Sequence, residues 1–119
     1  MKRILWALLL VMVIAGSAFG LSDKEYLRMK AKSAEFREAD EFLTECYDEC
    51  KDTLPRAKFK QIQQEQREWL KEGRDEQAGW FMEKGYSRIE AYTKATEMRA
   101  EDLHQICVIY RNAHWNDNN

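Results

Sequence analysis

The chain has 119 residues and a formal net charge of −2, and 45% of its residues are apolar and 34% charged, which is typical of one small domain. The averages hide an uneven distribution, because 15 apolar residues fall in the first 20 positions and only 38 in the 99 that follow. The chain therefore divides into two parts of different composition.

The first 20 residues predict a cleaved signal peptide. Lys2 and Arg3 precede an unbroken apolar run over residues 4–15, and small residues follow it. Twelve apolar residues rise only about 18 Å as a helix, too little for a bilayer, so we expect no stable membrane span after cleavage. Ala18 and Gly20 are small residues that suit the −3 and −1 positions of a cleavage site, so we expect cleavage after Gly20. Cleavage after Ala18 is the alternative. Since no Cys stands near the cut, we expect a periplasmic or secreted product without a lipid anchor.

Residues 21–119 then form one exported domain. Without Lys2 and Arg3, 17 basic residues face 21 acidic ones, which gives a net charge of −4. No basic block is present, so nucleic acid is excluded as a partner and a cationic partner is favoured. With one Pro, three Gly and no alternating β-branched run, these 99 residues predict an all-α fold.

Capping and helix-breaking residues divide the domain into three predicted helices. Ser22 and Glu25 form the S-x-x-E pattern of a capping box, in which both side chains accept backbone hydrogen bonds at a helix start. The apolar stripe of this first helix runs from Phe36 to Leu54. Pro55 is tolerated in the first turn of a helix, so a tight break and a new helix are predicted there.

The second predicted helix begins at Pro55 and ends near Gly85, which matches a glycine C-cap. A second capping box, Ser87 to Glu90, opens the third helix, which continues to Asn112. Three helices of about 30 residues joined by short turns predict a small antiparallel up-down-up three-helix bundle.

The three cysteines predict one disulfide in an oxidising compartment. Cys46 and Cys50 lie four residues apart on one helix, which holds their Cβ atoms about 5–6 Å apart, too far for a disulfide. A long-range bond from Cys107 is therefore favoured. All three pairings stay open, and Cys46 is slightly preferred over Cys50 as the partner of Cys107.

The sequence contains no catalytic motif, and we expect no enzyme, no catalytic residue and no cofactor. His104 and Cys107 are three residues apart and could share a metal ion, but two ligands do not close a site, so no metal is predicted. A thiol nucleophile is disfavoured because no His lies near Cys46 or Cys50 in the sequence.

Polar residues on the apolar stripes predict a polar layer inside the bundle. A buried Arg without a carboxylate is costly, so Arg74 and Arg99 should find partners, and Asp40 is a candidate for either. The layer fixes the register of the helices or, as the alternative, opens in part to a groove. Its predicted members are Asp40, Gln66, Arg74, Asp75 and Arg99.

Three segments resemble the lysozyme inhibitor LprI-like family. Residues 39–47 (ADEFLTECY) resemble its A-D-x-x-L-N-x-x-Y segment. Residues 66–75 (QREWLKEGRD) are similar to its Q-R-x-W-[LI] segment followed by an R-D pair, and residues 96–103 (TEMRAEDL) to its T-x-x-R-x-x-x-L. The three segments stand in the family's order and extend over most of residues 21–119.

The resemblance implies a small exported helical protein of bacteria, in a family named for a member that inhibits lysozyme. Thr44 stands where the family usually has Asn, and the Cys usual after the R-D pair is missing, so the family's disulfide from that position cannot form. Gly73 also lengthens the space between Trp69 and Arg74. No inhibitory motif carries over residue by residue.

An inhibitor of lysozyme or another cell-wall hydrolase needs a protruding element that fills the substrate cleft. The aromatic residues Trp80, Phe81 and Tyr86 are the candidate partner surface, with the end of the core as the alternative and favoured interpretation of Trp80 and Phe81. The second functional hypothesis is an envelope structural or adaptor module without inhibitory activity. It would use apolar residues off the main stripes: Tyr26, Met29, Val108 and Ile109.

Overall fold

The computed structural model describes residues 20–115, so the signal peptide predicted at residues 1–20 lies outside the described residues except for Gly20. Within this range the secondary structure is helical and contains no strand, which confirms the all-α prediction. The elements are α2 (Asp23–Lys32), α3 (Ala34–Thr53), α4 (Arg56–Glu68), the π-helix η1 (Trp69–Gly73), α5 (Arg74–Glu83) and α6 (Arg88–Ala113). No helix in residues 20–115 is long and apolar enough to cross a membrane.

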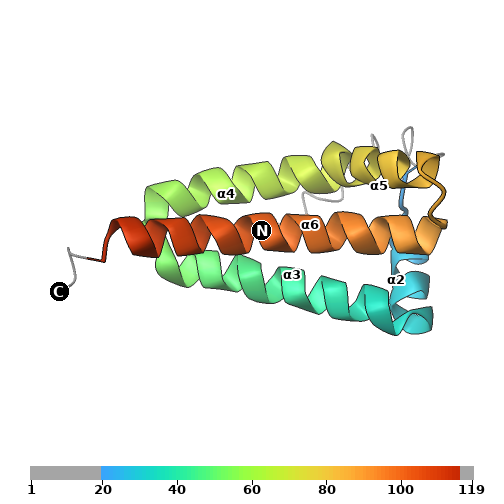
Figure 1. The fold of residues 1–119 in the computed structure, drawn as a ribbon, viewed down its shortest axis with the longest axis horizontal. Helices are drawn as coiled ribbons and strands as arrows, with labels where there is room; N and C mark the ends of the chain where they lie inside the picture. The colour runs from blue at the N-terminus through green and yellow to red at the C-terminus, as the bar shows by residue number, and fades with distance from the viewer. Residues whose placement is uncertain (1–19, 116–119) are drawn as a thin grey trace.

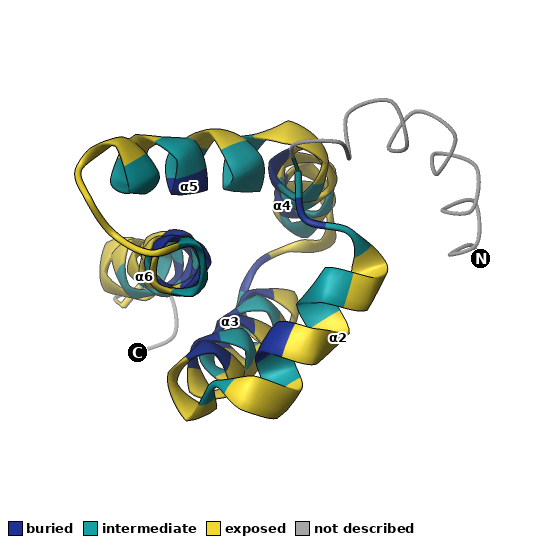
Figure 2. Cartoon of the chain, turned by 90° about the vertical axis from the view of Figure 1, so that its right-hand side faces the viewer, coloured by how far each residue is buried: buried dark blue, intermediate teal, exposed yellow. Residues whose placement is uncertain are grey.

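The helices form an elongated bundle of 51 × 32 × 24 Å. Figure 1 shows three long rods along the longest axis, namely α3, the continuous run α4–η1–α5, and α6. The short helix α2 lies across one end of the bundle, next to α3 (Figures 1 and 2). The remaining turns are short, and Gly85 takes the left-handed φ of 102° that ends α5, in keeping with the predicted glycine cap.

The first predicted helix is two helices, because Ser33 interrupts it. Ser33 has extended backbone angles (φ −117°, ψ 114°), and its hydroxyl accepts a hydrogen bond from the Phe36 N–H as the N-cap of α3. Ser22 caps α2 as predicted, but the Glu25 carboxylate does not complete the capping box and binds Arg88 instead. The box at Ser87 and Glu90 is complete.

A π-turn ending at Gly73 joins α4 to α5. The chain from Trp69 to Gly73 forms i→i+5 hydrogen bonds, and the helix continues as α5 without a break. A Cβ at Gly73 would lie 3.0 Å from Trp69 Cδ1, so only a glycine fits this wide turn without displacing the indole. Beyond the turn, the Gln77 side-chain oxygen accepts a hydrogen bond from Trp69 Nε1 at 3.1 Å.

Two hydrophobic clusters lie in the bundle. The first, here called the Leu21 cluster, consists of Leu21, Met29, Phe36, Ala78, Ala91 and Tyr92. The second, the cysteine cluster, consists of Leu43, Cys46, Cys50, Leu54, Ile62, Trp69, Ala100, Leu103 and Cys107. The Leu21 cluster draws on α2, α3, α5 and α6, whereas the cysteine cluster draws on α3, α4, η1 and α6.

Candidate functional site

The three aromatic residues predicted as a partner surface lie together where α5 turns into α6. The rings of Trp80 and Phe81 meet edge to face with centroids 5.0 Å apart, and Phe81 meets Tyr86 in the same way at 5.7 Å. Trp80 is 54% exposed and Tyr86 is 41% exposed, whereas Phe81 packs partly against the Leu21 cluster. The favoured interpretation of Trp80 as core is therefore wrong, whereas for Phe81 the packing agrees with it in part.

Two lysines cover the outer faces of this aromatic cluster. The Lys84 ammonium lies 4.7 Å from the Trp80 ring centroid, and the Lys94 ammonium lies 4.9 Å from that of Tyr86. Cation–π contacts of this kind are worth about 0.5–1 kcal/mol at exposed sites. They hold the two exposed rings in place before any partner arrives, which lowers the entropy that binding would cost.

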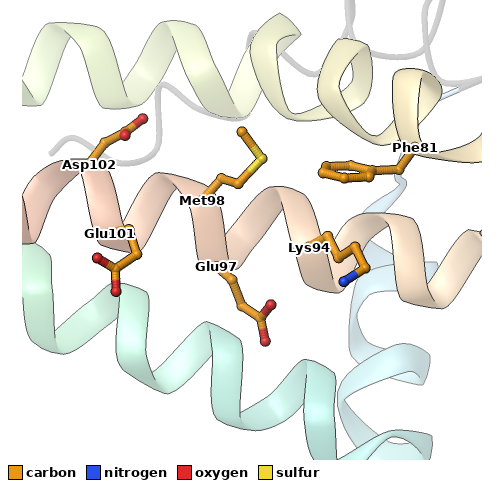
Figure 3. A pocket seen from close by; sticks show the side chains of 6 residues that line it. All are labelled: Phe81, Lys94, Glu97, Met98, Glu101 and Asp102. Carbon is orange, nitrogen blue, oxygen red and sulfur yellow. The ribbon is translucent and has the colours of Figure 1, made fainter. Parts of the chain in front are cut away.

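A groove of about 290 Å³ continues from the aromatic cluster between α5 and α6. Its lining residues are Phe81, Lys94, Glu97, Met98, Glu101 and Asp102, and we call it the acidic groove. Figure 3 shows Phe81 extending from α5 toward Met98, with the carboxylates projecting from the same stretch of α6. Met98 is 44% exposed, so the groove combines an apolar floor with an acidic edge.

The charges of the groove favour a cationic ligand. Three carboxylates and one ammonium line it, and the carboxylates are exposed to solvent. Exposed charges of one sign attract an oppositely charged protein and speed its encounter more than they set its affinity. The aromatic cluster and the groove share Phe81 and Lys94, so apolar contact and electrostatic attraction would act on the same partner.

The five predicted members of the polar layer do not form one layer, and only Gln66 and Arg99 are hydrogen-bonded to each other. Arg99 Nε donates a 2.7 Å hydrogen bond to the side-chain oxygen of Gln66, and burial lowers the pKa of Arg99. Asp75 instead accepts hydrogen bonds from Tyr92 Oη and the Leu21 N–H.

The prediction that Asp40 pairs with Arg74 or Arg99 is wrong. Asp40 accepts a 2.6 Å hydrogen bond from Tyr26 Oη and forms a 3.3 Å ion pair with Lys30, because α2 folds back against α3. Arg74 lies over the Trp69 ring, 5.9 Å from its centroid. Arg74 Nε and Arg99 Nη2 are buried with no hydrogen-bond partner among residues 20–115.

The cysteines are free thiols, and the closest pair differs from the one favoured by the sequence. Cys50 Sγ lies 3.0 Å from Cys107 Sγ, whereas the sequence slightly preferred Cys46 as the partner of Cys107. All three are buried. Burial raises the pKa of Cys46 to about 11 and, together with the Cys107 thiol, raises that of Cys50, so neither is a ready nucleophile at neutral pH.

Three side chains of metal-ligating types lie close together beside the cysteine cluster, although the sequence predicted no further ligands to complete a site with His104. Possible ligand atoms of Cys46, Glu49 and His104 all lie within 4.8 Å of one another. However, the Glu49 carboxylate is already bound by Arg111 at 2.8 Å and by His104 at 3.1 Å, and Arg111 lowers its pKa. The adjacent guanidinium repels a metal ion, so we interpret this group as an ion-pair network.

Of the four residues proposed for an adaptor surface, one is buried and two are partly buried. Met29 is buried in the Leu21 cluster, and Tyr26 is half-buried, with its ring 5.8 Å from that of Phe36. Val108 is also partly buried, whereas Ile109 is exposed. The adaptor hypothesis therefore retains little of the surface on which it was based.

The chain matches no family model, no curated protein and no solved structure. The resemblance to the lysozyme inhibitor LprI-like family therefore rests on the three sequence segments alone.

Proposed function

We propose that the protein is an exported helical binding protein that blocks a basic cell-wall hydrolase, such as lysozyme, by occluding its substrate cleft. The observation that carries this proposal is the continuity of the aromatic cluster with the acidic groove. Trp80 would enter the cleft, and Glu97 and Glu101 would face basic residues at its rim. In this proposal the protein performs no catalysis and needs no cofactor or metal.

Three features of the sequence support the export and the class of partner. The charge pattern of residues 1–20 is that of a signal peptide, which would deliver the domain of residues 21–119 to the periplasm or the exterior. The net charge of −4 in that domain suits a basic partner. The resemblance to the LprI-like family points to the same compartment and the same kind of target.

The scaffold that we propose for this function is an antiparallel up-down-up bundle of α3, α4–η1–α5 and α6, with α2 as an added helix across one end. The arrangement in Figure 1 supports it, since the aromatic cluster lies at one end of the rods, where α5 meets α6. A cluster at the end of an elongated bundle can enter a cleft that a flat helical face could not.

The experiment measures lysozyme activity on cell walls with increasing amounts of purified residues 21–119. We expect inhibition that falls about tenfold or more in Trp80→Ala, because exposed aromatic anchors carry much of the binding energy of an interface. Leu27→Ala is the matched control, since Leu27 is a similarly exposed apolar residue on α2. Undiminished hydrolysis at a large molar excess of the protein would contradict inhibition and leave the adaptor hypothesis.

The contribution of the acidic groove's charge to binding is tested by combining Glu97→Gln with Glu101→Gln. We expect this variant to associate more slowly, and the difference from the unchanged chain to shrink as salt rises. The matched control is Glu41→Gln combined with Glu45→Gln, an exposed pair with the same spacing on α3. Equal association rates for the two double variants would show that the acidic groove is not the binding surface.

A further inference from the structure

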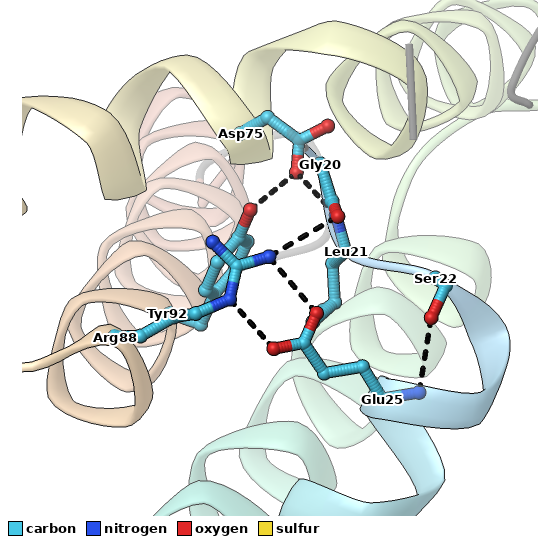
Figure 4. Close-up of polar contacts among 7 residues, drawn as sticks. All are labelled: Gly20, Leu21, Ser22, Glu25, Asp75, Arg88 and Tyr92. Atoms are coloured by element: carbon cyan, nitrogen blue, oxygen red, sulfur yellow. Dashed lines mark hydrogen bonds and ion pairs between the residues drawn. The ribbon is translucent and has the colours of Figure 1, made fainter. Parts of the chain in front are cut away.

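Leu21, the first residue of the predicted mature chain, is packed into the core. Leu21 is only 6% exposed and belongs to the cluster formed with Met29, Phe36 and Tyr92. The first residues of most domains are poorly ordered unless specific contacts hold them. Figure 4 shows the contacts that hold this one.

The backbone nitrogen of Leu21 is bound by a carboxylate. It donates a hydrogen bond of 3.2 Å to Asp75 Oδ1, and the same oxygen accepts a 2.7 Å bond from Tyr92 Oη (Figure 4). Tyr92 is fully buried, so it fixes the position of the Asp75 carboxylate from the side of α6. The main-chain amide of Leu21 is thus held by an ionisable group from α5, which is distant in the sequence.

Among residues 20–115 no cationic side chain forms a direct ion pair with the Asp75 carboxylate, although the charge of Arg88 acts on it from farther away. Arg88, the nearest candidate in Figure 4, forms two hydrogen bonds of 2.6 and 2.9 Å with Glu25, and its remaining bond shown goes to the carbonyl oxygen of Gly20 at 3.1 Å. Within residues 20–115, no lysine or arginine lies within 4.0 Å of the Asp75 carboxylate. A half-buried carboxylate with neutral donors only is suited to accept one positive charge.

We propose that Asp75 is the binding site for the new N-terminus of the mature protein, and that cleavage of the Gly20–Leu21 bond places an α-ammonium on it. This inference rests on the export proposed above. A leader peptidase would hydrolyse the bond, so that Gly20 leaves with a carboxylate and the Leu21 nitrogen becomes an amine that takes up a proton. The hydrogen bond from Leu21 to Asp75 then becomes an ion pair.

The space around Gly20 agrees with removal of the leader at this bond. A Cβ at position 20 would lie 2.5 Å from Asp75 Oδ2, so Gly20 itself passes against the carboxylate that the ammonium would use. Cleavage removes Gly20 and leaves room for the two additional protons of the ammonium. Arg88 keeps its bidentate contact with Glu25 after Gly20 has left.

The first test is the intact mass of the product exported from cells that express the 119-residue precursor. We expect a chain that begins at Leu21. A chain that begins at Phe19 would agree with export but would overturn this inference, because its ammonium would lie two residues before the Leu21 nitrogen that contacts Asp75. A full-length product of 119 residues would overturn the proposed export itself.

The second test compares the mature chain with and without acetylation of its N-terminus, which removes the charge and keeps an N–H. We expect acetylation to lower the Tm by about 2–6 °C at pH 6.5. In Asp75→Asn, acetylation should change nothing, whereas in Glu76→Gln, an exposed neighbour in the same turn, the full shift should remain. An equal shift in Asp75→Asn and the unchanged chain would overturn the proposal.

The pH dependence gives a readout that does not need the Asp75 variant to fold. The groups facing the Leu21 nitrogen are Asp75 on α5, Arg88 and Tyr92 on α6, and Glu25 on α2. A carboxylate contact raises the pKa of an amine, so the extra stability should be full below the ordinary amine value of about 7.7–8 and should disappear as the pH rises further. A difference between acetylated and free chains that stays constant from pH 6 to 10 would contradict the ion pair.

Discussion

The Leu21 cluster and the cysteine cluster stabilise the same bundle by different means. The Leu21 cluster is surrounded by ionic and polar contacts between helices, including Glu25 with Arg88 and Asp75 with Tyr92. The cysteine cluster is mainly apolar and contains three thiols, two of which meet between α3 and α6. We therefore expect oxidation to act mainly on the cysteine cluster, whereas pH should act on the ion pairs beside both clusters, Glu25 with Arg88 and Glu49 with Arg111.

The largest expected effects come from removing one large buried side chain from each cluster. Phe36 is 1% exposed and Leu103 is fully buried, so Phe36→Ala and Leu103→Ala should each lower the free energy of unfolding by about 3–4 kcal/mol. Urea unfolding followed by circular dichroism measures both. The exposed Leu27→Ala should change it by less than about 0.5 kcal/mol.

The number of transitions in these unfolding curves shows whether the two clusters unfold together or separately. If the two clusters unfold as one cooperative unit, both variants should give a single transition with an unchanged slope. A biphasic curve for Phe36→Ala alone would show that the two clusters unfold separately.

Oxidation should have the next largest effect. Because the two buried thiols face each other at 3.0 Å in the folded chain, we expect refolding in oxidised glutathione, during which the thiols are accessible, to form the bond between Cys50 and Cys107 and to leave Cys46 free. Each bond formed releases two protons and two electrons, which reduce one glutathione disulfide to two thiols. A link between residues 57 positions apart should stabilise the fold by about 2–4 kcal/mol.

Non-reducing peptide mapping identifies the pairing, and Cys107→Ser should abolish the gain in stability on oxidation. Cys46→Ser is the matched control, since it removes a buried thiol and should keep the gain. A map with Cys46 bonded to Cys107 would restore the pairing that the sequence favoured.

The ion pair between Glu25 and Arg88 should have the smallest effect. Arg88 lowers the pKa of Glu25, so the pair contributes above the unfolded-state pKa of about 4.3 and the contribution is lost as the pH falls through the folded value. Both side chains are partly exposed, which limits the expected loss in Glu25→Gln to about 0.5–1 kcal/mol at pH 7.

Thermal unfolding of Glu25→Gln between pH 2.5 and 7 measures this contribution, and the difference from the unchanged chain should vanish at the acid end. Glu35→Gln removes an exposed carboxylate from the first turn of α3 and should show a much smaller pH-dependent difference. The same acid dependence in both variants would indicate a general charge effect instead of the pair.

The sequence predicted those features that depend on neighbouring residues. Helix starts at Ser22 and Ser87, the break at Pro55 and the turn at Gly85 follow from local hydrogen bonding and backbone preference, and the structure has all of them. It missed the break at Ser33, although a serine three residues before a buried aromatic residue is itself a possible N-cap signal. The continuous apolar spacing on both sides concealed it.

The missed break explains the wrong partner of Asp40. Once the chain turns at Ser33, α2 folds against α3 and brings Tyr26 and Lys30 to that carboxylate. A single long helix would have carried both away from it. Similarly, whether Cys46 or Cys50 meets Cys107 depends on how far α3 is shifted along α6. The two pairings differ by a shift of one helical turn, and the residue spacing within either helix does not indicate which shift occurs. The contact of Glu49 with His104 was missed for the same reason.

The π-turn at Gly73 sets the rotational phase of everything after it. Each residue of an α-helix advances by about 100° around the axis, so one inserted residue would rotate the following helix by that angle if the turn did not widen to absorb it. If the same residues formed an ordinary α-helical turn, Asp75 and Trp80 would point about 100° away from the faces they now occupy. The widened turn therefore decides both which carboxylate meets the Leu21 nitrogen and which way the exposed indole faces.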